Sequence, residues 1–124
     1  MTSDGLDTQL KALGFERLSR WIPHKEKTKL ESLSWKECAG WIYAFVAQGR
    51  VRYVGITTMV LRSRIDAYRD MKDDRVRRLI LDRLANDEDV ELYGLRRPQV
   101  TPIDLEKEES GLIKLFGSDW NIKK

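Results

Sequence analysis

The stretch that decides the fold of this chain is Trp41-Ile42-Tyr43-Ala44-Phe45-Val46-Ala47-Gln48-Gly49-Arg50-Val51-Arg52-Tyr53-Val54-Gly55. An apolar and aromatic run leads into a turn that contains Gly49, and an alternating run from Val51 to Gly55 follows. Two such runs around a glycine turn are typical of a β-hairpin. This hairpin carries two tyrosines, Tyr43 and Tyr53.

The length of the hairpin loop determines whether the two tyrosines lie on the same face. A three-residue loop from Gln48 to Arg50 pairs Phe45 with Tyr53 and Tyr43 with Gly55, which puts both tyrosines on one face. A two-residue loop puts them on opposite faces, because side chains alternate along a strand. We predict the three-residue loop.

Composition restricts the classes of protein to which the chain could belong. Its 124 residues fit one domain, and no apolar run approaches the roughly 18 residues of a membrane-spanning helix. One cysteine, Cys38, and one histidine, His24, exclude an internal disulfide and argue against a Cys/His zinc site. We therefore expect a cytoplasmic protein with no membrane partner.

The distribution of charge is more informative than the net value of +3. Basic side chains crowd the middle of the chain, at Arg50, Arg52, Arg62, Arg64, Arg69, Lys72, Arg75, Arg77, Arg78 and Arg83. Arginine suits bidentate contacts with phosphate. A solvated helix face gives the same pattern, so charge alone leaves both interpretations open.

The remaining elements follow from apolar spacing and from Gly and Pro. Residues 1–39 read as a helical extension, with a helix from Leu6 to Leu13 and a segment from Phe15 to Trp21, packed on a core at 40–124. A helix is expected from Asp74 to Ala85, with Arg75 and Arg78 pointing outward, and a third strand from Val90 to Leu95.

Two charged residues fall on apolar helix stripes. After a connector at 56–59, a helix beginning near Val60 places Arg64 toward the core and Arg62 toward solvent, so that Arg64 needs a buried carboxylate or a bound phosphate. A last helix follows Pro102, with Asp104 as its cap, and ends at Gly117. Its apolar sector contains Glu109, a carboxylate that must be paired, protonated or bound to a metal.

These residues together resemble the GIY-YIG nuclease superfamily over residues 40–122. The hairpin supplies two triplets, Trp41-Ile42-Tyr43 and Tyr53-Val54-Gly55. The helices supply Leu61, Arg64, Tyr68 and Glu109, and Asn121 follows Glu109 by twelve residues. Residues 112–122 also resemble the T-even phage endonuclease II branch. The chain departs from the pattern at Trp41, where the family has glycine, and at Ile56, where several relatives have lysine.

The resemblance implies an α+β fold with a small three-stranded antiparallel sheet flanked by helices. It implies a metal-dependent DNA endonuclease of phage, mobile-element or restriction type, which hydrolyses phosphodiester bonds and needs a homo-oligomer or two events to cut both strands. The alternative is a nucleic-acid binding module with an inactive site.

The resemblance also implies a role for each site residue. Tyr43 would accept a proton from the attacking water, directly or through an intermediate water. Glu109 would bind Mg²⁺ or Mn²⁺, and Arg64 would hold a phosphate oxygen. Tyr53 and Tyr68 would orient the water or phosphate. Asn121 would tie the C-terminal segment to the site, and Gly55 would let backbone and DNA approach closely. The candidate substrate contacts are Gly55, Arg62, Arg75 and Arg78.

Overall fold

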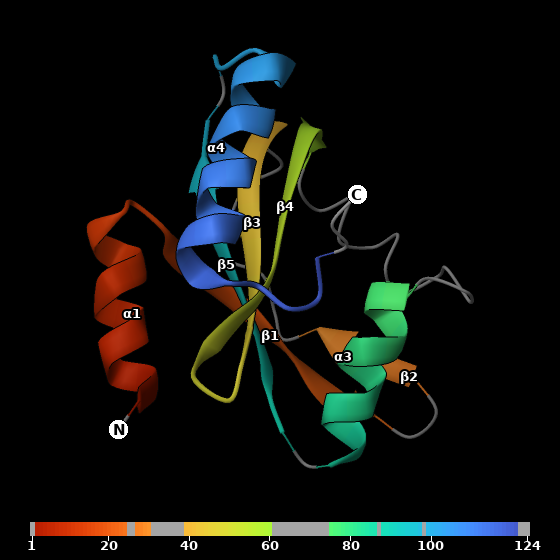
Figure 1. The fold of residues 1–124 in the computed structure, drawn as a ribbon. Coiled ribbons are helices and arrows are strands. Elements are labelled where there is room, and N and C mark those ends of the chain that lie inside the picture. Colours follow the sequence, from red (N-terminus) through yellow and green to blue (C-terminus); the bar gives the residue numbers. More distant parts are fainter. Residues whose placement is uncertain are drawn as a thin grey trace.

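The computed structural model describes residues 2–24, 27–30, 39–60, 75–86, 88–97 and 99–121. The helices among them are α1 (Thr2–Ala12), α3 (Arg75–Ala85) and α4 (Pro102–Phe116), and the strands are β1 (Glu16–His24), β2 (Lys27–Leu30), β3 (Ala39–Ala47), β4 (Arg50–Val60) and β5 (Val90–Arg96) (Figure 1). The helix expected from Val60 onward, with Arg62, Arg64 and Tyr68, lies outside the described residues.

The described strands form one antiparallel sheet in the order β2-β1-β5-β3-β4. The α+β class is confirmed and the three predicted strands are present as β5, β3 and β4, but the prediction of only three strands is wrong. The segment after Gly14 is strand β1 rather than part of a helical extension. It pairs with β5, where Arg17 binds Glu91 at 2.5 Å and Arg20 binds Asp89 at 2.8 Å. This pairing supplies backbone partners to an edge of β5 that would otherwise be open.

The hairpin between β3 and β4 has a two-residue turn, so the predicted loop length is wrong. Gln48 and Gly49 both have positive φ, 54° and 70°, and Ala47 pairs with Arg50, which is the pattern of a type I′ turn. A bulge then shifts the register, because Val46 pairs with Val51 but Phe45 pairs with Tyr53. The extra residue is Arg52.

The bulge restores the predicted pairing of the tyrosines. Phe45 faces Tyr53 and Tyr43 faces Gly55, and the ring centroids of Tyr43 and Tyr53 lie 6.3 Å apart. The prediction that both tyrosines share one face is therefore confirmed. One extra residue in β4 compensates for one residue fewer in the turn, since each shifts the alternation of side chains by one.

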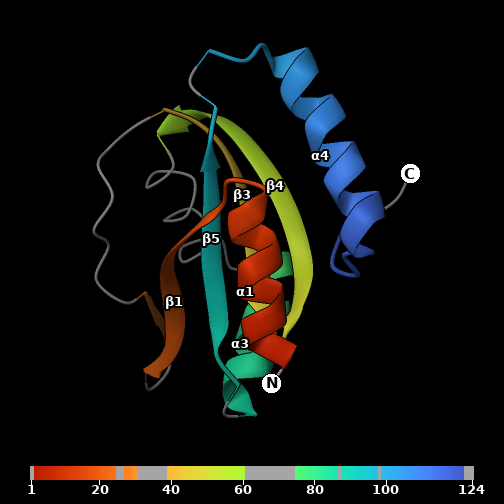
Figure 2. The same cartoon turned by 90° about the vertical axis from the view of Figure 1, so that its left-hand side faces the viewer.

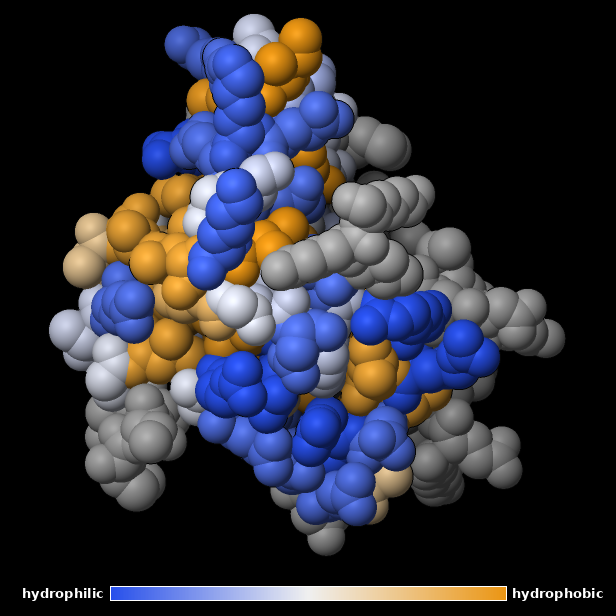
Figure 3. All heavy atoms as spheres, viewed as in Figure 1, coloured by the Kyte–Doolittle hydropathy of each residue, from blue (hydrophilic) through white to orange (hydrophobic). Residues whose placement is uncertain are grey.

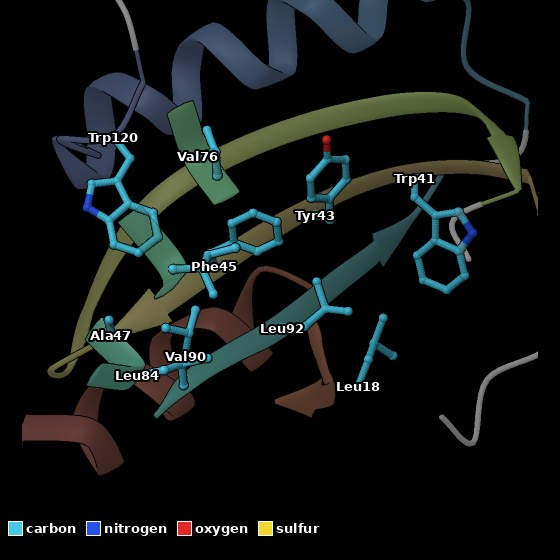
Figure 4. Close-up of a cluster of buried hydrophobic side chains, with 11 residues drawn as sticks. Leu18, Trp41, Tyr43, Phe45, Ala47, Val76, Leu84, Val90, Leu92 and Trp120 are labelled. Carbon is cyan, nitrogen blue, oxygen red and sulfur yellow. The ribbon is translucent and has the colours of Figure 1, made fainter. Parts of the chain in front are cut away.

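Helices cover both faces of the sheet. Val76, Ile80 and Leu84 of α3 pack on the face that holds Tyr43 and Phe45 (Figure 4). The other face is covered by α1 and α4 through an apolar cluster that includes Leu10 and Leu105. In Figure 2, α1 lies in front of the strands and α3 behind them. No described helix is long and apolar enough to cross a membrane.

Both ends of helix α4 have clear causes. Thr101, rather than the predicted Asp104, caps α4, and its hydroxyl accepts a hydrogen bond from the Asp104 amide at 3.2 Å. Gly117 ends the helix in the left-handed conformation, as predicted, with φ 59°. The chain then crosses β4 toward α3 (Figure 1).

Candidate active site

A pocket of about 370 Å³ lies where α3, α4, β4 and the C-terminal segment meet. Seven side chains line it: Tyr53, Arg75, Val76, Glu109, Ile113, Trp120 and Asn121. Three of the six predicted catalytic residues and one predicted substrate contact are among them. Because these residues come from four separate segments, the fold rather than local sequence brings them together.

Glu109 reaches the pocket from α4. It follows Leu105 by one turn, and Leu105 is fully buried while Glu109 is partly buried, as the predicted stripe requires. Burial, and then the negative charge of Glu106, raise the pKa of the Glu109 carboxyl above its usual range. Within the described chain this carboxylate forms no ion pair, although Arg75 lines the same pocket.

The neighbouring carboxylates differ from Glu109. Glu108 accepts a hydrogen bond from Arg97 at 3.0 Å, so its charge is already balanced, and Glu106 is exposed. Helical phase therefore selects the carboxylate that faces the pocket, as the sequence predicted.

Asn121 joins the C-terminal segment to β4 through the backbone of Val54. Its side-chain nitrogen donates to the Val54 carbonyl at 2.9 Å, and its side-chain oxygen accepts from the Val54 amide at 3.0 Å and from the Ser118 hydroxyl at 2.5 Å. Because Val54 lies between Tyr53 and Gly55, this clamp holds the segment beside the second tyrosine triplet. A carboxamide is suited to the position, since it has both a donor and an acceptor.

Tyr53 and Tyr43 occupy different depths. Tyr53 lines the pocket and stacks on Phe45, with centroids 5.4 Å apart. Tyr43 is fully buried, and its hydroxyl points toward β4 (Figure 4). Burial by itself disfavours a phenolate, so a role for Tyr43 as a base requires positive charge at the site.

Gly55 serves a purpose that the sequence did not predict. A Cβ on Gly55 would lie 2.4 Å from Cζ and 2.5 Å from the hydroxyl oxygen of Tyr43. The space that was predicted to admit DNA on this side of the strand is thus filled by the tyrosine ring. On the same face, Trp41 lies over Gly94 of β5, the strand that pairs with the other edge of β3. A Cβ on Gly94 would lie 3.0 Å from the Trp41 ring. Trp41, the departure from the family triplet, therefore packs against a glycine on the neighbouring strand.

Arginines supply the positive charge near the pocket. The Arg75 guanidinium donates to the Trp120 carbonyl and lines the cavity. Arg78, one turn later on α3, is exposed outside the pocket lining, and Figure 3 shows hydrophilic side chains gathered over this helix. Arg62, Arg64 and Tyr68 lie outside the described residues, so their predicted roles stay predictions.

The donor set fits a single hard cation held mainly by water. No group of three or more His, Cys, Asp or Glu that could hold a metal occurs in the described part of the chain. Mg²⁺ commonly binds proteins through one or two carboxylates and keeps several waters. A partly buried carboxylate that lines a cavity and forms no ion pair with another described residue meets that requirement.

Two residues that matter to the site were missed from the sequence. Trp120 is buried in the core and forms part of the pocket wall, and Arg52 is buried beneath the turn. Strand alternation placed Arg52 on the face opposite Tyr53. Its buried position beneath the turn was not predicted, because a bulge leaves no clear signal in a single sequence.

The fold is similar to that of known nucleases. The structure of a mutant of bacteriophage T4 EndoII matches 98% of this chain and 100% of its own, with 23% identity and a TM-score of 0.71. The restriction endonuclease HPY188I in complex with product DNA matches 92% of this chain and 86% of its own, with 18% identity and a TM-score of 0.54. No family model matches the chain, and no curated protein matches it in sequence. The predicted likeness to endonuclease II of a T-even phage is confirmed as a similarity of fold.

Proposed function

We propose that this protein is a DNA endonuclease that hydrolyses phosphodiester bonds with the help of a divalent cation at Glu109. The observation that carries the proposal is the pocket, in which Glu109, Tyr53, Asn121 and Arg75 meet. Carboxylate, phenol, amide and guanidinium groups are what phosphate hydrolysis needs for metal binding, orientation and charge stabilisation. Two nucleases with this fold support the same reading.

Each side chain has a role that matches its position. Glu109 holds the cation, Mg²⁺ or Mn²⁺, which when bound neutralises the phosphate and stabilises the leaving oxygen. Arg75 binds a phosphate oxygen with the guanidinium donors that do not reach Trp120. Tyr53 orients the phosphate or water from the pocket wall, and Tyr43, fully buried beside Tyr53, takes the proton of the attacking water through an intermediate water. Arg64 and Tyr68 lie outside the described residues and keep the roles that the family resemblance implies.

A plasmid assay tests this function. Supercoiled DNA incubated with the protein and Mg²⁺ is expected to become nicked and then linear, and DNA in excess EDTA is expected to stay supercoiled. Persistent supercoiled DNA together with normal DNA binding contradicts the proposal and identifies a binding module. Linear product whose yield rises with the square of protein concentration indicates that two copies cut together.

The pH dependence of cleavage follows from Glu109. Its raised pKa means that the carboxyl is protonated at higher pH than an ordinary one, and a protonated carboxyl does not hold a cation. Cleavage is therefore expected to fall as pH decreases, and more Mg²⁺ should shift the fall to lower pH. Glu106→Ala removes the second cause of the raised Glu109 pKa, so it should also shift the fall in cleavage to lower pH. If neither more Mg²⁺ nor Glu106→Ala shifts the pH profile of cleavage, Glu109 is not the group whose protonation limits the reaction.

Arg78 is expected to bind DNA backbone outside the pocket. Because it is exposed, Arg78→Ala should weaken binding without changing the fold, and should reduce the slope of log affinity against log salt by about 0.9. Filter binding at several salt concentrations measures this slope. Arg96→Ala, an exposed arginine at the far end of β5, is the control, and an equal effect there would show that total charge alone matters.

A further inference from the structure

Arg52 is a buried arginine that the proposed reaction does not use. It is the extra residue of the β4 bulge and is 6% exposed. Its guanidinium donates to the Ala47 carbonyl at 3.3 Å, to the Gln48 side chain at 2.8 Å and to Asp119 at 2.9 Å. The first two acceptors lie at the hairpin turn, at the end of β3 and in the turn itself, and Asp119 belongs to the turn after α4. One guanidinium therefore joins two segments that are far apart in sequence.

The segment joined by Arg52 forms one wall of the pocket. The Trp120 amide donates to the Arg52 carbonyl at 2.7 Å, and Asn121 holds the Val54 backbone on the same strand. Trp120 and Asn121 both line the pocket. Asp119 comes directly before them and does not line the pocket. Its contact with Arg52 therefore acts on the pocket through its neighbours.

We propose that Arg52 and Asp119 form a latch that positions the C-terminal wall of the pocket, and that Arg52 is a positioning residue for the cleavage proposed above. β4 is an edge strand, so the segment docks on backbone groups that water could otherwise bind. When the segment leaves, the buried guanidinium loses the carboxylate that balances it, which is unfavourable. Docking of the wall is thereby coupled to the hairpin turn.

The bulge explains why an arginine can have this role. With the same two-residue turn but no extra residue, Tyr53 would point to the face opposite Tyr43, and residue 52 would point to the face of Tyr43. The same irregularity thus places Tyr53 in the pocket and turns the Arg52 side chain toward the turn and Asp119.

The test combines amide exchange with cleavage, so that it does not depend on the proposed function alone. In Asp119→Ala, exchange at the Trp120 and Val54 amides is expected to become about tenfold faster or more, because a charged hydrogen bond holding the segment is lost. Amides in β3 should keep their protection. The single-turnover cleavage rate should fall at least as far, with DNA affinity unchanged or higher, since a negative charge is removed. Asp119→Asn keeps an acceptor for Arg52, so it should retain most of the amide protection and most of the cleavage rate.

Asp89→Ala is the matched control, because Asp89 also pairs with an arginine at 2.8 Å and is similarly exposed, at 50% against 45% for Asp119. It should change neither readout. Unchanged exchange in Asp119→Ala, or equal changes in Asp89→Ala, would overturn the latch. Slower cleavage with unchanged exchange would also overturn it, because Asp119 would then act directly. If the wild type does not cleave DNA, the proposed function fails while exchange still decides the latch.

Discussion

Glu109→Ala is expected to reduce DNA cleavage in Mg²⁺ by about a thousandfold or more, because a metal ligand supplies several kcal/mol of transition-state stabilisation. DNA affinity should stay the same or rise slightly, since the change removes a negative charge from a pocket that binds phosphate. The carboxylate lines the pocket without an ion pair to another described residue, so its removal should not destabilise the fold. Single-turnover cleavage of a labelled duplex and gel-shift binding measure the two effects.

Glu106→Ala is the control for this change. Glu106 lies on the same helix but is exposed, and its removal should leave cleavage near neutral pH within a fewfold of wild type. If Glu106→Ala abolishes cleavage and Glu109→Ala does not, the metal site has been assigned to the wrong face of α4.

Gly55→Ala is expected to destabilise the protein by about 2–3 kcal/mol, the typical cost of forcing an extra group into a packed core. The new methyl would lie 2.4 Å from Tyr43, which is fully buried and cannot move aside freely. The φ of Gly55 is not in the left-handed region, so steric contact alone causes the effect. For a domain of this size, the thermal midpoint should fall by about 10 °C.

Two further variants show whether the ring of Tyr43 is responsible. Gly111→Ala, in α4, meets nothing within 4 Å and should raise stability by about 0.5–1 kcal/mol, because alanine favours helix. Leucine has a shorter side chain than tyrosine, so in a Tyr43→Leu background Gly55→Ala should reduce stability much less. An equal loss of stability in both backgrounds would contradict the conclusion that Gly55 leaves room for the Tyr43 ring.

The hairpin shows both the reach and the limit of sequence patterns. Alternation and the glycine-containing loop predicted two paired strands, and the pairing of Tyr43 with Gly55 was correct. The loop length was wrong because a short turn and a bulge together give the same pairing as a longer loop. The two arrangements differ in the pairing of Arg50, Val51 and Arg52, and Arg52 binds Asp119, 67 positions away.

The N-terminal region illustrates a second limit. The residues from Glu16 to His24 form a strand because β5 offers them a backbone partner, and that partner lies about 70 positions later in the chain. Local propensity carries no information about such an edge. By contrast, the helix from Arg75 to Ala85 and the end of α4 at Gly117 were predictable, since spacing and a left-handed cap are local signals.

The site was predictable in part for the same reason. Helical phase selected Glu109 among three nearby glutamates, and the family resemblance pointed to Asn121 and Tyr53. Arg52 and Trp120 gave no signal, because their importance depends on a turn that folds back on the edge of the sheet.

The most direct test of the central claim is the rate of single-turnover DNA cleavage by the wild-type protein as a function of Mg²⁺ concentration. We predict no cleavage in EDTA and a rate that rises to saturation with Mg²⁺, as expected when one weakly bound cation at Glu109 completes the site. Cleavage that continues unchanged in EDTA would contradict the claim, as would intact DNA at every Mg²⁺ and Mn²⁺ concentration.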